Sequence, residues 1–171
     1  MTTNLTVRQA QILDLIKKHI TETAWEKGWI KPIVSSKKQN QKVAIIGSGP
    51  AGLAAATYLI EYGYDVEVFE KNDRIGGLMI YGIPNFKLDK SVVIRRHEWL
   101  KESGVIFHTN CEVGKDITFD DLEKNFDAIL ISTGVYKARS LDLNTKKVNN
   151  SVPALDYLIE SNRVGLGDSP S

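Results

Sequence analysis

Residues 43–77 read VAIIGSGPAGLAAATYLIEYGYDVEVFEKNDRIGG, and this stretch decides the fold. It begins with a short apolar run, 43–46, of the kind that is buried on both faces of a parallel sheet. A helical segment, 51–63, follows at once, and a second strand, 65–70, comes after it. The order strand, glycine turn, helix and strand predicts an α/β domain with a parallel sheet and flanking helices.

Three glycines stand at the junction between the first strand and the helix. Gly47 can take backbone angles that a side chain would forbid, and Gly49 lets the main chain approach a pyrophosphate. Gly52 lets the helix pack closely on the strand. The N-terminus of the helix presents free N–H groups to an anion. This turn therefore predicts a phosphate-binding site.

An acid follows at the distance expected for ribose recognition. Glu70 ends the second strand, 18 residues after Gly52, where its carboxylate can accept hydrogen bonds from both ribose hydroxyls. A glycine turn alone is weak evidence, but here it has its full strand and helix context. A second glycine pair, Gly76-Gly77, lets another backbone segment approach the cofactor. In this the continuation 74–77 resembles the two-dinucleotide-domain flavoproteins, and the resemblance favours FAD over NAD. We therefore expect a Rossmann-like FAD-binding domain, the first half of such a flavoprotein.

The rest of the chain continues the alternation of helices and strands. Thr6 and Gln9 form a capping-box pattern, and apolar residues recur at helical spacing until Gly28. We expect an N-terminal helical lead-in and linker, 1–40, and a partial FAD-binding domain, 41–171. The later elements are a helix capped by Asp89 and stopped by Gly104, a strand at 105–108, a helix from Thr118, a strand at 127–132, and a helix opened by Ser151 and Pro153 and running to about Asn162.

Composition narrows the function classes. The chain has 171 residues, 42% of them hydrophobic, and 22 Lys and Arg against 21 Asp and Glu. Basic and acidic residues nearly balance, so the charge gives no indication that nucleic acid or an anionic membrane is a partner. No apolar run is long enough to span a bilayer. With no signal pattern at residues 1–10, we expect a cytoplasmic location.

The sequence offers no catalytic or metal-binding constellation. His19, His97 and His108 lack the spacing of a metal site. The single cysteine, Cys111, cannot assemble a four-thiolate iron–sulfur site and is expected to be a small packed residue. This fits a flavin enzyme, in which the cofactor performs the redox chemistry.

Longer segments carry a family resemblance. They read GGLMIYGIPNFKLDK from Gly76, GVIFHTNCEVGKDI from Gly104, FDAILISTGVYKARSL from Phe126 and VPALDYLIESNRVGLGD from Val152. Together with the glycine turn they resemble the FAD-binding part of the small (beta) subunit of glutamate synthase. The related region of dihydropyrimidine dehydrogenase is similar too. The chain looks like one part of such a flavoprotein, the first half of an FAD domain.

The resemblance implies an activity and its components. The family oxidises NADPH through FAD and passes electrons by iron–sulfur clusters to a large subunit that makes L-glutamate. NADPH and the clusters would be bound by the remainder of the flavoprotein, not by this chain, because only one glycine fingerprint and only one cysteine are present. The partners implied are that remainder and the large subunit. The isolated chain is expected to be inactive.

The resemblance also assigns cofactor contacts by position. The pyrophosphate turn is Gly47, Ser48, Gly49, Pro50, Ala51 and Gly52. Glu70 holds the ribose, and the middle of FAD is lined by Gly76, Gly77 and Leu78, with the basic Lys87 nearby. Val113 meets the adenine through its backbone, and Thr133 with Gly134 closes over the phosphates.

Three functional interpretations stay open at this point. The chain is a domain or fragment of an electron-transfer flavoprotein, or a stand-alone dinucleotide-binding module that works with a partner, or a truncated product without activity. A second glycine fingerprint downstream would distinguish the first from the others.

Overall fold

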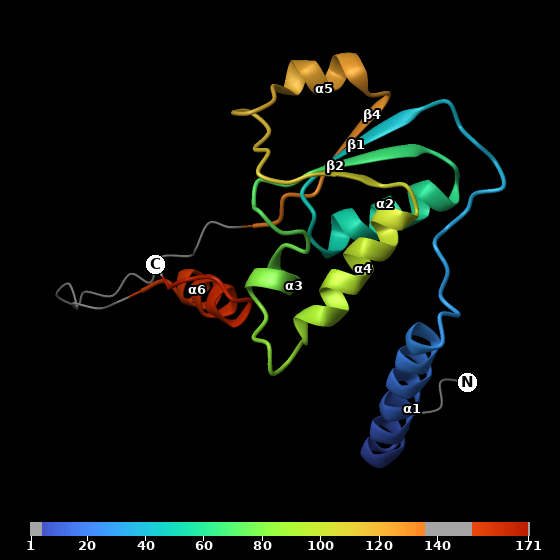
Figure 1. The fold of residues 1–171 in the computed structure, drawn as a ribbon, viewed down its shortest axis with the longest axis vertical. Coiled ribbons are helices and arrows are strands. Elements are labelled where there is room, and N and C mark those ends of the chain that lie inside the picture. The colour runs from blue at the N-terminus through green and yellow to red at the C-terminus, as the bar shows by residue number, and fades with distance from the viewer. Residues whose placement is uncertain (1–4, 136–151, 171) are drawn as a thin grey trace. The chain divides into compact units, whose positions relative to one another are not determined.

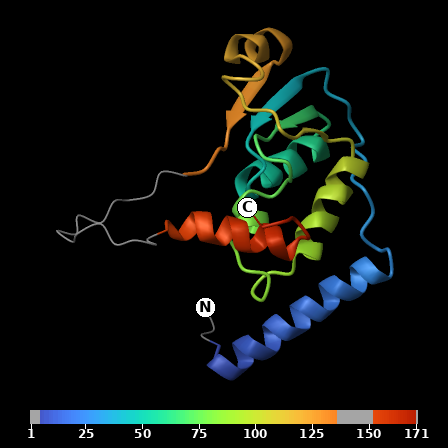
Figure 2. The ribbon, with the colours of Figure 1, turned by 60° about the vertical axis from the view of Figure 1, so that its left-hand side comes forward.

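The computed structural model describes residues 5–135 and 152–170. The chain divides into two compact units, residues 1–32 and 33–171, and Figures 1 and 2 show the fold from two sides. The domain boundary that we expected after residue 40 stays a prediction. The predicted strand at 127–132 is described, whereas the segment after Val135 and the predicted helix opener Ser151 lie outside the described residues.

The first unit contains one helix, α1 (Val7–Glu26). Thr6 caps it as predicted: the Gln9 backbone N–H donates to Thr6 Oγ1 (3.3 Å), and the Thr6 N–H donates to Gln9 Oε1 (2.9 Å). Gly28 follows the helix end with a φ of +64°, a conformation that favours glycine. No residue of α1, which the structure describes in full, is buried.

The second unit is built on a four-stranded parallel sheet. Its strands are β1 (Lys42–Ile46), β2 (Asp65–Phe69), β3 (Ile106–His108) and β4 (Ala128–Ile131), in the order β3-β2-β1-β4. The chain builds outward from β1 to β2 and β3 and then returns to the other side of β1 for β4. In sheets of this kind, ligands bind at the carboxyl ends of the strands where the order reverses. That point lies between β1 and β4.

Helices cover both faces of this sheet. Figures 1 and 2 show α2 (Pro50–Glu61) and α4 (Lys90–Glu102) on one face and α5 (Phe119–Asn125) on the other. Alternate residues of β1 face the two layers, since Ala44 and Ile46 join a buried cluster with Phe69 and Leu122 on the α5 side. Strand β1 is therefore buried on both faces, as its apolar run predicted, whereas Leu130 and Ile131 of the equally apolar β4 are exposed.

The predicted helix limits are confirmed in most places. Asp89 caps α4 by accepting from the Ser91 N–H (2.9 Å), and Gly104 follows the helix with a φ of +101°. Thr118 caps α5. The last helix, α6 (Ala154–Gly165), begins after Pro153 and runs three residues beyond its expected end. A one-turn helix, α3 (Leu78–Tyr81), was not predicted.

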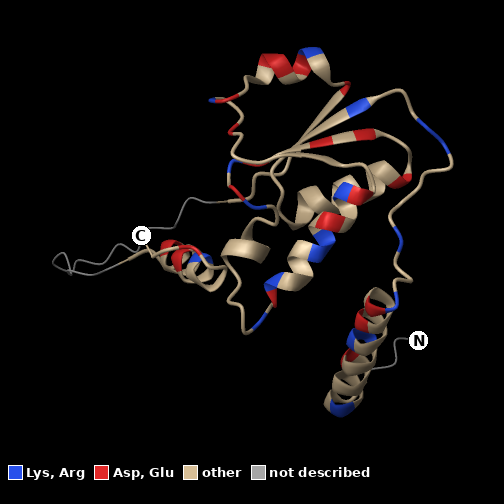
Figure 3. Ribbon diagram, in the orientation of Figure 1, with Lys and Arg blue, Asp and Glu red and all other residues tan. Residues whose placement is uncertain are grey.

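Charge is distributed without a dominant sign. Figure 3 shows basic and acidic residues interspersed, with both kinds on α4 and on α5. Within the described residues, no helix combines the length and the apolar character that crossing a bilayer requires.

Candidate functional site

A cleft of about 540 Å³ opens at the carboxyl ends of β1, β2 and β4. This volume lies in the range of small-molecule and cofactor sites. The strand ends, the turn after β1, the start of α3 and the segment after β3 form its walls. The lining residues are Ile46, Gly47, Ser48, Gly49, Pro50, Ala51, Phe69, Glu70, Lys71, Gly77, Leu78, Cys111, Glu112, Val113, Ser132, Thr133, Gly134 and Val135. The structure thus brings together all of the predicted site residues except Gly52, Gly76 and Lys87.

The glycine turn has the backbone geometry that its sequence predicted. Gly47 has a φ of +103°, and a Cβ there would lie 2.6 Å from the carbonyl oxygen of Ser132. A Cβ on Gly52 would lie 2.1 Å from the Gly47 oxygen, so Gly52 serves close packing of α2 behind the cleft. Gly49 differs, because its Cβ would meet no heavy atom within 4 Å. Because Gly49 lines the cleft, this free space beside its backbone is part of the cleft.

The N-terminus of α2 lies at this turn. Gly49 is the N-cap residue, and no side chain in the described part of the chain caps that helix end. The first backbone N–H groups of a helix lack partners within the helix, and they carry partial positive charge. A phosphate group in the cleft would supply the acceptors that these donors lack.

Glu70 lies between the turn and the second glycine segment and is 4% exposed. Its Oε2 accepts from the Ser48 backbone N–H (3.1 Å) and from Ser48 Oγ (2.6 Å). Its Oε1 accepts from the backbone N–H (2.9 Å) and the side-chain Nδ2 (2.7 Å) of Asn72. Ser48 Oγ also accepts from the Gly76 N–H (3.1 Å). Ser48 thereby joins the glycine turn, the acid and the glycine pair.

The two glycines of the second pair have different surroundings. Gly76 has a φ of +126°, and a Cβ there would lie 2.7 Å from Val93 Cγ1 on α4. Gly76 therefore packs behind the cleft and does not line it, unlike the position expected from the resemblance. Gly77 has a φ of +53°, and its Cβ would lie 2.9 Å from the Gly49 Cα. Two backbone segments thus approach each other at the cleft with no side chain between them.

The remaining walls come from β4 and from the segment after β3. The Ser132 N–H donates to the Ile46 oxygen (2.8 Å), and Ser132 Oγ donates to the Gly47 oxygen (3.0 Å), so β4 is tied to the glycine turn. Thr133 and Gly134 follow directly on the cleft side. Opposite them, Cys111 packs with Val113 against the core cluster, as expected for a small packed residue. Burial raises the pKa of the Cys111 thiol.

The structure places Lys87 away from the cleft lining. It is exposed in the loop between α3 and α4, and its proposed role near the cofactor stays a prediction. The lysine that is buried is Lys90, which is 5% exposed. Its Nζ donates to the carbonyl oxygens of Met79 (2.9 Å) and Ile83, and burial lowers its pKa. Lys90 holds the loop that follows α3.

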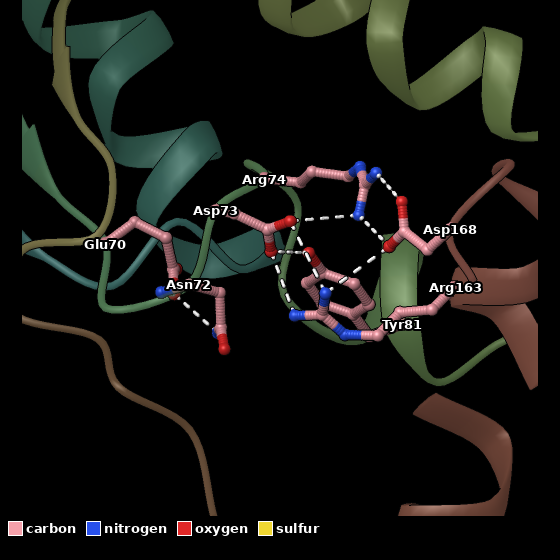
Figure 4. Close-up of polar contacts among 7 residues, drawn as sticks. All are labelled: Glu70, Asn72, Asp73, Arg74, Tyr81, Arg163 and Asp168. Atoms are coloured by element: carbon pink, nitrogen blue, oxygen red, sulfur yellow. Dashed lines mark hydrogen bonds and ion pairs between the residues drawn. The ribbon is translucent and has the colours of Figure 1, made fainter. Parts of the chain in front are cut away.

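A network of charged residues fixes the loop between Glu70 and α3 (Figure 4). Arg74 forms two hydrogen bonds to Asp168, Nη1 to Oδ2 at 2.7 Å and Nη2 to Oδ1 at 2.5 Å. Arg163 of α6 donates to Asp73 (3.0 Å), and the Tyr81 hydroxyl donates to the same carboxylate. Paired Arg–carboxylate bonds of this kind are strong and directional. The network therefore attaches α6 and the residues after it to the second glycine segment.

Tyr81 should make stability sensitive to alkaline pH. Burial and the hydrogen bond to Asp73 raise the pKa of Tyr81 from 10.0 to about 12. Since the unfolded tyrosine loses its proton first, the stabilisation is complete below pH 10 and is lost as the pH rises toward 12. Urea unfolding at several pH values should show the wild type losing stability relative to Tyr81→Phe over this window. The exposed Tyr157, replaced by Phe, is the control, and parallel curves for the wild type and Tyr81→Phe would contradict the assignment.

The histidines lie on separate elements: His19 on α1, His97 on α4 and His108 on β3. His108 stacks on Phe69 with ring centroids 4.7 Å apart, and its Nε2 lies 2.7 Å from Glu67 Oε2. Among the described residues, no group of three or more His, Cys, Asp or Glu side chains is placed to hold a metal ion.

The sheet order, the glycine turn and the acid after β2 define a Rossmann-like nucleotide-binding domain, and residues 45–93 match the family described as NAD(P)-binding Rossmann-like domain. Over 154 residues, 90% of its length, the chain is 50% identical to the NADPH glutamate synthase small chain of Azospirillum brasilense. Over 143 residues, 84% of its length, it is 47% identical to the same protein of Bacillus subtilis strain 168. The resemblance to the glutamate synthase small subunit family is thereby confirmed. The chain spans about a third of the length of these relatives, 32% and 29%.

Solved structures show the same fold. The chain superimposes on Mycobacterium tuberculosis FprA in complex with NADPH with a TM-score of 0.64 and 23% identity, covering 72% of this chain and 29% of that one. A 2-naphthoyl-CoA reductase matches with a TM-score of 0.56 and 28% identity, over 75% of this chain and 19% of that one. The Rossmann-like fold with its parallel sheet and flanking helices is as the sequence predicted.

Proposed function

We propose that the cleft holds the ADP half of FAD, as the first part of the flavin domain of an NAD(P)H-dependent oxidoreductase. Three features that meet at one cleft carry this proposal. They are the N-terminus of α2, which no side chain of the described residues caps, the close approach of the Gly49 and Gly77 backbones, and Glu70. The pyrophosphate would lie at Gly49 and Ala51, with the ribose toward Glu70 and the adenine against Val113. When bound, FAD supplies the hydride and electron chemistry.

The similarity to glutamate synthase small chains supports a more specific role. In that role the chain belongs to a flavoprotein that passes electrons from NADPH through FAD, toward a large subunit that makes L-glutamate. The remainder of the flavoprotein would bind NADPH and the iron–sulfur clusters. In this role Glu70 plays no catalytic part: it binds and orients the cofactor.

Replacing Glu70 tests the proposal directly. Glu70→Gln should weaken the binding of ADP-ribose about tenfold or more, because charge-assisted hydrogen bonds are each worth about 1.5–3 kcal/mol. Isothermal titration calorimetry measures the affinity. Urea unfolding of the same sample shows whether the fold is retained, since Glu70 also accepts hydrogen bonds from Ser48 and Asn72.

The matched control is Glu67→Gln. Glu67 lies on β2, three residues before Glu70, but it pairs with His108 and does not line the cleft, so its replacement should leave ADP-ribose affinity unchanged. Equal losses at both positions, or a wild-type chain that binds no ADP-ribose, would remove the ribose assignment.

A further inference from the structure

The Glu70 carboxylate already has a full set of hydrogen bonds inside the protein. A carboxylate offers about four lone-pair sites, and four donors reach it: the backbone N–H and Oγ of Ser48, and the backbone N–H and Nδ2 of Asn72. Ribose hydroxyls can therefore bind Glu70 only by replacing one or more of these donors. The sequence pattern, which pairs an acid with ribose, gives no sign of this competition.

The donors differ in how easily they are replaced. Ser48 is 0% exposed, and its Oγ is held from two sides, because it donates to Glu70 and accepts from the Gly76 N–H. Moving Ser48 would disturb both glycine segments. Asn72 is only half-buried, and its side chain can turn about its own torsions while its backbone N–H stays on Oε1. The Nδ2 bond of Asn72, drawn beside Glu70 in Figure 4, is the one that can be given up.

We propose that the Asn72 amide occupies the place of a ribose hydroxyl on Glu70 Oε1 and is displaced when an adenine nucleotide binds. This inference rests on the proposed function of the cleft. Ser48 keeps Oε2 oriented throughout, and one hydroxyl of the adenosine ribose replaces Asn72 Nδ2 as the donor to Oε1. Asn72 is thus a positioning residue that keeps Glu70 hydrogen-bonded in the free protein and lowers the affinity for the ribose.

Removing the competitor should strengthen nucleotide binding. Asn72→Ala should raise the affinity for ADP about threefold to tenfold, because the net value of one protein hydrogen bond corresponds to a factor of this size. The affinity for 2′,3′-dideoxy-ADP should stay within about twofold of the wild type. That ligand lacks the ribose hydroxyls, so it does not need to displace Asn72.

The experiment is a calorimetric titration of both ligands into the wild type, Asn72→Ala and a matched control, Asn125→Ala. Asn125 also uses its Nδ2 in a hydrogen bond, to the Asp121 carbonyl oxygen at 2.7 Å, but it lies on α5 and its amide does not bond to Glu70. Thermal unfolding checks that each variant is folded. If Asn72→Ala does not fold, Asn72→Leu removes the same donor while keeping most of the volume, with the same expected result.

A gain for ADP alone, in the Asn72 variant alone, supports the proposal. Equal or weaker ADP binding by a folded Asn72 variant would overturn it, and so would an equal gain for both ligands. These outcomes leave the proposed function standing as long as the wild type prefers ADP over the dideoxy ligand. A wild type that binds both ligands equally, or neither, would overturn the ribose contact itself and this inference with it.

Discussion

The 171-residue chain, supplied with excess FAD, is expected not to oxidise NADPH at an enzymatic rate. Hydride transfer requires the nicotinamide to lie against the flavin at roughly 3–3.5 Å. In the two-dinucleotide-domain flavoproteins that the chain resembles, a second nucleotide domain builds that geometry, and this sequence contains one glycine fingerprint. Stopped-flow mixing with NADPH, followed by flavin absorbance, should show no bleaching above the rate for free FAD.

The control is a longer protein in which the segments matching the remainder of the glutamate synthase small chain are supplied. It should bleach the flavin within the dead time or over milliseconds to seconds. Rapid bleaching by the 171-residue chain alone would contradict the prediction. An additional NADPH site would then have to be sought within residues 78–171.

Gly52→Ala should have the largest effect on stability among single substitutions in the glycine turn. A methyl group in a helix normally stabilises it by up to about 1 kcal/mol. Here the new Cβ would lie 2.1 Å from the Gly47 carbonyl oxygen and 2.8 Å from Ser132 Oγ, so the start of α2 and the backbone of the turn must move apart. We expect a loss of about 3 kcal/mol in the free energy of unfolding, measured with urea.

Gly49→Ala separates binding from folding at the same turn. Its φ of −66° suits any residue, and its Cβ would meet nothing within 4 Å, so stability should change by less than about 1 kcal/mol. ADP affinity should nevertheless fall at least about tenfold, because the methyl group occupies the space through which a pyrophosphate approaches the backbone. Gly165→Ala at the end of α6, also without contacts, should change stability by no more than about 1 kcal/mol and leave ADP affinity unchanged. Normal ADP binding by Gly49→Ala would show that the pyrophosphate does not lie at this turn.

Local signals in the sequence predicted most of the fold. Helix limits followed from side chains that bond within three residues of themselves, such as Thr6 with Gln9 and Asp89 with the start of α4. Glycines at Gly47 and Gly104 have the positive φ values that a turn at those places requires. The burial of β1 on both faces was predicted from its continuous apolar run. Each of these features depends on neighbouring residues, so the sequence contains it directly.

The features that were missed depend on residues far apart in the chain. Arg74 forms two hydrogen bonds to Asp168, which follows α6, and 94 positions separate the two residues. The bond from Ser48 Oγ to Glu70 spans 22 positions, and it saturates an acid that the pattern treats as free for ribose. Lys87 and Lys90 look equivalent in sequence. Lys90 is the first residue of α4, and at this place its side chain is buried against the carbonyl oxygens of Met79 and Ile83.

The pairing of β1 with β4 also sets the order in which the molecule can assemble. The Lys42 N–H donates to Asp127 Oδ2 at 2.7 Å, and the Asp127 N–H donates to the Lys42 oxygen at 2.9 Å, across 85 positions of sequence. Closing so long a loop is entropically unfavourable and slow, whereas β1, α2 and β2 are contiguous. On the ribosome, the wall formed by Ser132 to Val135 can join the turn only after residue 135 has left the exit tunnel. A nucleotide that needs this wall can therefore bind only after β4 has paired with β1.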